Sequence, residues 1–192
     1  ADGEITVKGP SVFQGYYRDE EKTKEAFTED GYFMTGDIGH IDEEGFLHIT
    51  DRKKEMFKTS GGKYVAPQVL ENLAKGSKFI EQIMVVGDGE KMPCALVQPD
   101  YAFAKLWAER KHLKIGKTPE EMANSPELKA RIMKDINLLN ATLGKWEQIK
   151  KIELTPTLWT IEDGLLTPTM KLKRKAVKEK FFNLYEKLYD RA

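Results

Sequence analysis

The sequence has little cysteine and little histidine, and it has no excess charge of either sign. Its 192 residues include one cysteine, Cys94, and three histidines, and 31 basic side chains balance 31 acidic ones. One cysteine cannot form an internal disulfide or a zinc site built from several cysteines, and such a composition is typical of a reducing compartment. The neutral balance argues against a nucleic-acid or membrane-coating protein, because those partners attract a basic surplus. We therefore expect a cytoplasmic protein that binds no nucleic acid.

Long apolar runs are also missing. No stretch approaches the ~20 apolar residues that span a bilayer, and the first residues lack the pattern of a signal peptide. Hydrophobic residues nevertheless make up 40% of the chain, which is sufficient for a packed core. The length predicts one ordinary domain, or a small domain and part of another.

Charge is unevenly distributed along the chain. Residues 1–50 hold 4 basic and 12 acidic side chains, whereas residues 171–180 hold six basic side chains and one acidic one. Cations at the start of a helix oppose the helix dipole. We therefore expect an anion to face this basic cluster: a neighbouring acidic surface, the acidic first segment or a bound phosphate.

Hydrophobic patterning predicts an α+β protein. Up to about residue 50 the pattern is β-rich with one helix over 19–27 and a β-hairpin around 33–49. After residue 51 strands and helices alternate without a strict βαβ order. The strands expected there are 82–87, 94–98 and 149–154, and the helices run from Pro67 to about Gly76 (apolar face Val69, Leu70, Leu73 and Ala74), from Asp100 to about 113, over 126–143 and over 173–190.

The histidines and the cysteine give no catalytic or metal-binding pattern. His40 and His48 are expected to face each other across the hairpin, and a solvated pair explains them better than a metal site does. Cys94 lies in an apolar strand, so we expect a buried, unreactive thiol. The sequence predicts no metal site of its own.

Two short segments are candidates for ligand binding. Asp37, expected on a tight loop, could accept hydrogen bonds from two vicinal hydroxyls of a ribose; an Asx-turn is the plainer alternative. The small residues of Thr59–Lys63 would let the backbone approach a ligand, and Lys63 could meet a phosphate. A simple hairpin turn is the alternative for this second segment.

In order along the chain, these segments and others resemble the AMP-forming acyl-CoA synthetases of the adenylate-forming superfamily. Five motifs in fixed order are far more specific than any one of them. They are Gly3–Pro10 with Gly15-Tyr16-Tyr17, Phe33–Ile38, Gly45–Glu55, Lys58–Glu71 and Leu166–Arg174.

Within that family the chain is most similar to the long-chain fatty acid–CoA ligase group. Many relatives place glycine directly before the C-terminal lysine, where this sequence has Met170 before Lys171. The helix-rich insert over about 100–146 also resembles this group. The resemblance implies that a fatty acid and ATP form an acyl-adenylate, which coenzyme A converts to acyl-CoA and AMP.

The resemblance also implies roles for individual residues. Asp37 would hold the ribose hydroxyls, and Arg52 would assist at the same nucleotide. Lys63 would bind at the phosphate end of ATP. Lys171 would be the catalytic cation of adenylation.

For the second half-reaction, the resemblance implies a mobile C-terminal domain. Lys54 would sit at a hinge over residues 51–54. Gly61 would line the coenzyme A passage, and Lys58 would lie beside it.

The same resemblance divides the chain into a short all-β tail of a large adenylation domain, 1–50, and the small mobile C-terminal domain, 51–192, a small mixed sheet flanked by helices. Upstream motifs of the family are absent, so we expect a fragment that is inactive alone. Mg²⁺ would be bound mainly by the missing domain, and peripheral attachment to a membrane is compatible with a fatty substrate. A stand-alone, non-catalytic binding module derived from such a domain is the alternative.

Overall fold

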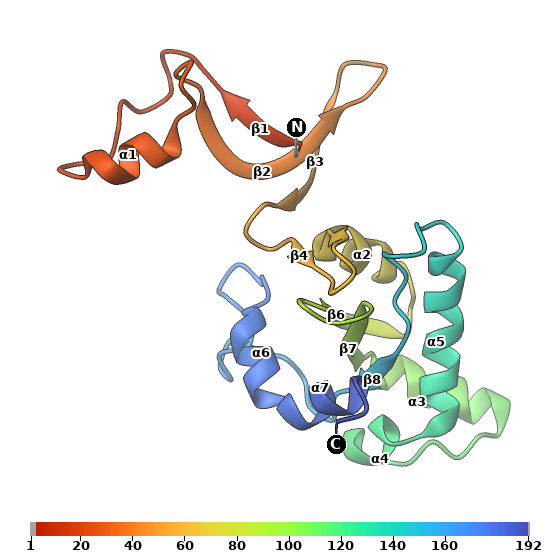
Figure 1. The fold of residues 1–192 in the computed structure, drawn as a ribbon. Coiled ribbons are helices and arrows are strands. Elements are labelled where there is room, and N and C mark those ends of the chain that lie inside the picture. Colours follow the sequence, from red (N-terminus) through yellow and green to blue (C-terminus); the bar gives the residue numbers. More distant parts are fainter. Residues whose placement is uncertain (1–2, 192) are drawn as a thin grey trace. The chain divides into compact units, whose positions relative to one another are not determined.

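The computed structural model describes residues 3–191 and divides the chain into two compact units, residues 1–56 and 57–192 (Figure 1). Helices and small sheets occur together, so the predicted α+β class is confirmed. The elements of the first unit are β1 (Glu4–Val7), α1 (Glu20–Ala26), β2 (Phe33–Ile41) and β3 (Leu47–Arg52). Those of the second are β4 (Phe57–Lys58), β5 (Tyr64–Val65), α2 (Pro67–Ala74), β6 (Ile80–Val86), β7 (Cys94–Pro99), α3 (Tyr101–Lys111), α4 (Pro119–Ala123), α5 (Pro126–Asn140), β8 (Ile152–Leu154), α6 (Arg174–Lys180) and α7 (Phe182–Leu188).

The first unit is an antiparallel sheet in the order β1-β2-β3. The turn between β2 and β3 forms because the Asp42 carboxylate accepts hydrogen bonds from the N–H groups of Glu44 and Phe46. His40 pairs with His48 across these strands with ring centroids 5.2 Å apart, as predicted. A 2.6 Å bond between the His48 ring and Asp42 is the largest of the interactions that lower the pKa of Asp42.

Helix α1 and three phenylalanines complete the first unit. The helix begins after Asp19, whose carboxylate accepts a hydrogen bond from the N–H of Lys22. Phe27, just beyond the helix, packs against Phe13 and Phe33 with ring centroids 5.6 Å away in each case. This aromatic contact holds the helix to the sheet.

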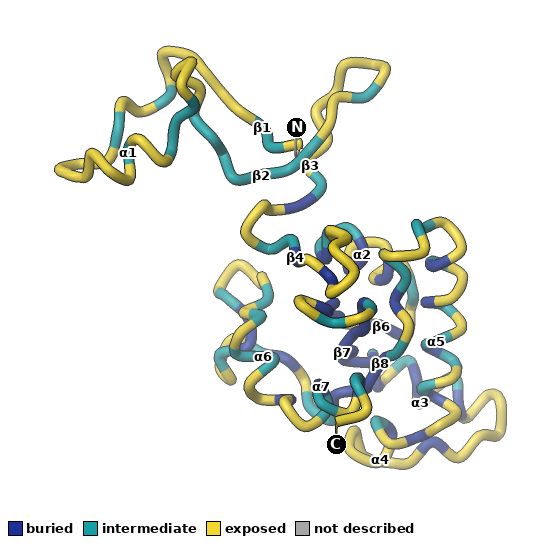
Figure 2. Tube along the Cα trace, in the orientation of Figure 1, coloured by how far each residue is buried: buried dark blue, intermediate teal, exposed yellow. Residues whose placement is uncertain are grey.

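The second unit is built on the sheet β6-β7-β8, in which β7 pairs antiparallel with β6 and parallel with β8. Alternate residues of a strand point to opposite faces. Ile83 and Val85 therefore join a core that includes residues of α2, α3 and α5, while Met84 joins a second core that includes residues of α6 and α7. Continuous apolar runs predicted these strands because both faces are buried (Figure 2).

Cys94 is the first residue of β7 and is 0% exposed. Burial raises the pKa of its thiol, which keeps the group protonated and unreactive. The prediction of a buried thiol is confirmed.

The expected single helix over 173–190 is wrong. The chain forms α6 and α7, and Phe181 between them leaves helical geometry with φ −110° and ψ 33°. Phe181 is buried near Trp159, with ring centroids 6.2 Å apart, while the next residue, Phe182, is exposed. The break at these two bulky rings lets Tyr185 and Leu188 of α7 reach the same core.

Helix α4 was not expected, although its signal is in the sequence. Thr118 accepts a hydrogen bond from the N–H of Glu121, whose own carboxylate bonds the N–H of Thr118. This reciprocal capping box precedes only five helical residues. The apolar periodicity was too short to mark the helix.

The predicted hinge, residues 51–54, covers the end of β3 and the start of the turn after it. The carbonyl of Arg52 accepts hydrogen bonds from the N–H groups of Glu55 and Met56, which closes that turn. The division into compact units falls between Met56 and Phe57, a few residues beyond the predicted boundary at 50/51. The hinge itself stays a prediction.

Candidate functional site

Asp37 lies on β2 and faces Arg52 on β3. The two residues are register partners, and Arg52 Nε donates a hydrogen bond of 3.0 Å to Asp37 Oδ1. Asp37 therefore belongs to a strand and not to the tight loop that its Thr-Gly-Asp context predicted. The sequence signal for a loop was overridden because β1 and β3 flank this stretch and pair with it. A carboxylate accepts several hydrogen bonds, so the pairing with Arg52 is compatible with further donors such as ribose hydroxyls.

A second carboxylate fixes the backbone beside Asp37. Glu4 on β1 accepts a hydrogen bond from the N–H of Gly36 through Oε1 and bonds Lys53 Nζ at 2.6 Å through Oε2. The carbonyl of Gly36 in turn accepts the N–H of Lys53. These bonds hold the start of the predicted hinge against the strand that carries Asp37.

The segment Thr59–Lys63 is the turn of the β4–β5 hairpin. The N–H of Thr59 bonds the carbonyl of Lys63 at 2.9 Å, and Gly62 has φ 78°, a conformation that favours glycine. At Gly61 a side chain would first meet Thr59 Oγ1, 3.9 Å from its Cβ, so the space beside this residue is open. The turn matches the plainer alternative in form, and it leaves backbone open to a ligand.

Both lysines of this hairpin lie over exposed aromatic rings. Lys58 Nζ is 5.5 Å from the ring centre of Tyr64, and Lys63 Nζ is 5.7 Å from that of Trp146. Contacts of this kind hold a cation by a weak attraction to the ring face. Because this attraction is weak, an anionic ligand could draw either ammonium group away from its ring.

Lys171 lies on a tight loop that we call the lysine loop, residues 165–173. The N–H of Thr167 bonds the carbonyl of Lys171 at 2.8 Å, and its hydroxyl accepts the N–H of Lys171 at 3.0 Å. Met170 takes φ 61°, a left-handed backbone conformation that favours glycine. The backbone around Lys171 is thus fixed while its side chain stays exposed.

A buried carboxylate, Glu71, and a partly buried guanidinium, Arg174, lie close to this loop, and the sequence alone predicts no role for either. On α2, Leu73 of the expected apolar face is half exposed, and Glu71 is buried in its place. The Glu71 carboxylate accepts two hydrogen bonds from Arg174 at 2.8 and 2.7 Å. An anion thus faces the basic cluster at Arg174, as expected, but no local signal could identify a residue 103 positions away.

The structure groups the predicted site residues within each unit. Asp37, Arg52 and Lys54 belong to the first unit. Lys58, Gly61 and Lys63 share one hairpin of the second unit, and Lys171 lies on a separate loop of that unit.

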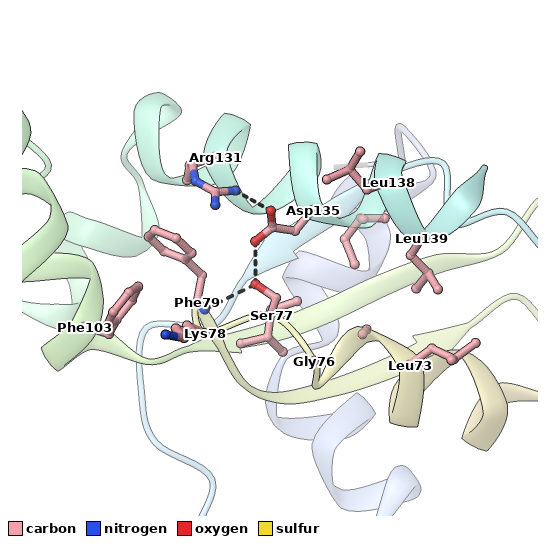
Figure 3. A pocket seen from close by; sticks show the side chains of 13 residues that line it. Leu73, Gly76, Ser77, Lys78, Phe79, Phe103, Arg131, Asp135, Leu138 and Leu139 are labelled. Carbon is pink, nitrogen blue, oxygen red and sulfur yellow. Dashed lines mark hydrogen bonds and ion pairs between the residues drawn. The ribbon is translucent and has the colours of Figure 1, made fainter. Parts of the chain in front are cut away.

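A cavity of about 430 Å³ in the second unit lies away from these residues (Figure 3). Arg131 pairs with Asp135 at 2.5 Å, and the hydroxyl of Ser77 donates to the same carboxylate at 2.6 Å. Leu138 and Leu139 are among its apolar lining residues. Its polar groups bond one another, so their arrangement does not point to a ligand.

Residues 3–191 contain neither a membrane-spanning helix nor a metal-binding cluster. No helix in this range is long and apolar enough to cross a membrane. The same residues contain no group of three histidine, cysteine or acidic side chains arranged to hold a metal ion.

Comparison with known proteins identifies the fold. Residues 55–192 match the family described as the AMP-binding enzyme C-terminal domain. The adenylation domain of a carboxylate reductase from Mycobacterium chelonae superposes with a TM-score of 0.76 at 29% identity, over 98% of this chain and 28% of that one.

Similar sequences come from bacteria and mammals. Long-chain-fatty-acid–CoA ligase FadD15 of Mycobacterium tuberculosis is 44% identical over 190 residues, which are 99% of this chain and 32% of that protein. Human long-chain-fatty-acid–CoA ligase 1 is 40% identical over 98% of this chain and 27% of its own. The chain therefore spans about a third or less of the length of these relatives. Because the family match covers most of its residues, the chain belongs to the AMP-binding enzyme C-terminal domain family.

Proposed function

We propose that this chain is the C-terminal part of an AMP-forming long-chain fatty acid–CoA ligase. The observation that carries the proposal is sequence identity of 40–44% to proteins named long-chain-fatty-acid–CoA ligases, over nearly the whole chain and across both of its units. The lysine loop and the Asp37–Arg52 pair supply charged groups suited to a nucleotide and an acyl phosphate.

The proposed reaction has two steps. A carboxylate oxygen of the fatty acid attacks the α-phosphorus of ATP, an O–P bond forms, and pyrophosphate leaves with the electrons of the broken bond. The thiol of coenzyme A then attacks the acyl carbon, forms the thioester, releases AMP and gives up its proton. Both transition states carry negative charge that positioned cations would stabilise.

Lys171 is our candidate for the catalytic cation of the first step. Lys171 is exposed on a loop, and two hydrogen bonds to Thr167 hold its backbone. The backbone is therefore preorganised, while the ammonium group is free to reach a ligand. Charge stabilisation of this kind is effective when the cation is held in place before the reaction.

Asp37, Arg52 and Lys63 are our candidates for binding ATP. The Asp37 carboxylate suits the ribose hydroxyls, with Arg52 fixing its orientation at 3.0 Å. Lys63 would contact the phosphates. Mg²⁺ would accompany ATP, bound mainly by residues outside this chain.

Lys54, Lys58 and Gly61 are our candidates for the second step. We infer that the C-terminal domain turns about residues 51–54, so that the β4–β5 hairpin replaces Lys171 at the reaction centre. Moving one domain lets a single site serve two steps that need different neighbours. The open space at Gly61 suits the passage of the coenzyme A arm, with Lys58 beside it.

The proposed partners are small molecules: a fatty acid, ATP and coenzyme A. The proposed location is the cytoplasm, and peripheral attachment to a membrane would be compatible with a fatty substrate. The fragment alone is expected to be inactive.

The test uses the full-length protein that contains this chain and scores the two steps separately. Lys171→Ala should lower acyl-adenylate formation by about a hundredfold or more while thioester formation from supplied acyl-adenylate survives. Lys175→Ala is the matched control, because this lysine is just beyond the loop and its side chain is 92% exposed. If the unaltered protein forms no thioester with any fatty acid, the ligase proposal is wrong and a non-catalytic module remains.

A further inference from the structure

We propose that Glu71 and Arg174 are positioning residues that hold the lysine loop in place for adenylation. The inference rests on the proposed function for its catalytic consequence. Its structural basis is a closed set of hydrogen bonds that joins helix α2, strand β6 and the first residue of α6.

The contacts around Glu71 form a ring. Oε1 of Glu71 accepts the N–H of Val85 at 2.8 Å and Arg174 Nη2 at 2.8 Å, and Oε2 accepts the same Nη2 at 2.7 Å. Arg174 Nη1 donates to the carbonyl of Val85 at 3.2 Å. The guanidinium therefore grips a carboxylate and a backbone carbonyl together, which the single ammonium of lysine would not reproduce.

The ring is anchored to rigid backbone. β6 is an edge strand of its sheet, and the two backbone groups of Val85 bond Glu71 and Arg174. Val85 itself is 1% exposed and belongs to the main core. Arg174 is thus fixed to the backbone of a buried core residue as well as to the Glu71 carboxylate.

The other end of the connection is the lysine loop. The N–H of Lys173 bonds the carbonyl of Leu165 at 2.9 Å, which closes the base of the loop directly before Arg174. Leu165 is 1% exposed, so the base is also held by packing. Two residues separate Arg174 from Lys171, and a shift of the arginine would therefore displace the catalytic candidate.

Burial makes the pair costly to break. Glu71 is 5% exposed, and removal of Arg174 would take from this buried carboxylate a cation that bonds both of its oxygens. Cations at the start of α6 oppose the helix dipole, and the pair offsets this effect because Glu71 supplies an anion there.

The experiment uses the full-length protein and measures each half-reaction. Arg174→Met should lower the rate of acyl-adenylate formation by about a hundredfold, because misplacing a reacting group by about 1 Å has an effect of this size. Thioester formation from supplied acyl-adenylate should change by less than about threefold, because it does not use Lys171. Arg174→Lys keeps the charge but loses the planar guanidinium. Its rate of acyl-adenylate formation should lie between that of Arg174→Met and that of the unaltered protein.

Glu153→Gln is the matched control. Glu153 is another buried carboxylate of the same unit, 6% exposed and paired with Lys129 and Lys187, neither of which belongs to the lysine loop. This variant should unfold at lower temperature yet keep both half-reactions. If Arg174→Met slows both half-reactions equally, or if Glu153→Gln produces the same selective loss, the pair is merely structural and the inference is wrong.

Hydrogen exchange separates this inference from the proposed function. The amides of Met170 and Lys171 are bonded to Thr167 and should exchange faster in Arg174→Met than in Glu153→Gln, even in a protein that proves to have no ligase activity. Failure of the unaltered protein to form acyl-adenylate would reject the function alone. Unchanged exchange at these amides in Arg174→Met would reject the positioning role.

Discussion

Arg52 Nε lies 3.0 Å from Asp37 Oδ1, and the two residues are partners across adjacent antiparallel strands. The strand pairing sets the separation of their backbones, so the two side chains meet without any loop having to become ordered. The Asp37 side chain remains 25% exposed and the Arg52 side chain 59% exposed, so the pair is open to a ligand. The pair is therefore preformed and accessible, as the proposed nucleotide contact requires.

Asp37→Asn should weaken ATP binding by the full-length protein. A hydrogen bond to a charged group contributes about 1.5–3 kcal/mol, which corresponds to a rise of about ten- to a hundredfold in the KM for ATP. Asp42→Asn, in the turn of the same hairpin, is the control and should leave this KM unchanged. Equal effects of the two substitutions in steady-state kinetics would contradict a specific role for Asp37.

Met170→Gly should leave the stability of the chain unchanged or raise it by up to about 1 kcal/mol. A side chain at φ 61° costs about 1–2 kcal/mol, and its removal offsets the extra entropy that glycine gives the unfolded chain. Thr169→Gly, measured against Thr169→Ala, gives the ordinary cost of glycine in this loop, about 0.5–1 kcal/mol of destabilisation. Urea unfolding measures the stability of each variant. A similar loss of stability on glycine substitution at both positions would disprove strain at Met170.

The parts of the fold that could be predicted from sequence depend on local or periodic signals. Strands β6 and β7 show continuous apolar runs, and the turn before β3 depends on Asp42, whose carboxylate bonds the N–H groups of residues two and four positions later. The break at Phe181 could not be predicted, because an apolar face continues on both sides of it and only packing in the core shows where the helix must bend.

The same distinction holds for the candidate site. The motif residues were identifiable in order along the chain, but the strand position of Asp37 depends on pairing with β1 and β3. The partner of Arg174 depends on a contact across 103 positions. Local sequence predicts that a buried or clustered charge needs a partner, and only the folded chain identifies that partner.

Ile132→Ala should destabilise the second unit by about 2–5 kcal/mol. Ile132 lies in α5 with 0% of its surface exposed and belongs to the main core, so the substitution leaves a cavity there. Leu138→Ala in the same helix, where the side chain is 67% exposed, should change stability by less than about 0.5 kcal/mol. Equal unfolding free energies of the two variants would mean that α5 is not packed as the structure has it.

Alkaline pH should unfold the chain through buried hydroxyl and thiol groups. Burial raises the pKa of Cys94, Tyr101 and Tyr189, and burial together with Glu90 raises the pKa of Tyr185 to about 12. Above the ordinary values, about 8.5 for cysteine and about 10 for tyrosine, the unfolded chain releases these protons and the folded chain keeps them. The unfolded state is then favoured as pH rises, by up to about 1.4 kcal/mol per pH unit for each group.

Urea titrations at about pH 8 and about pH 10.5, on either side of the ordinary tyrosine pKa, measure this loss. The stability should be fully present at the lower pH and clearly reduced at the higher one. Tyr189→Phe removes one raised pKa together with the hydrogen bond from this hydroxyl to the carbonyl of Met92, so its stability should depend less on pH. Tyr17→Phe is the control, because Tyr17 is 84% exposed and the substitution should leave the pH dependence as it was. A dependence that is equally steep in the unaltered chain and in Tyr189→Phe would mean that folding does not raise the pKa of Tyr189, and that its hydroxyl is not buried as the structure has it.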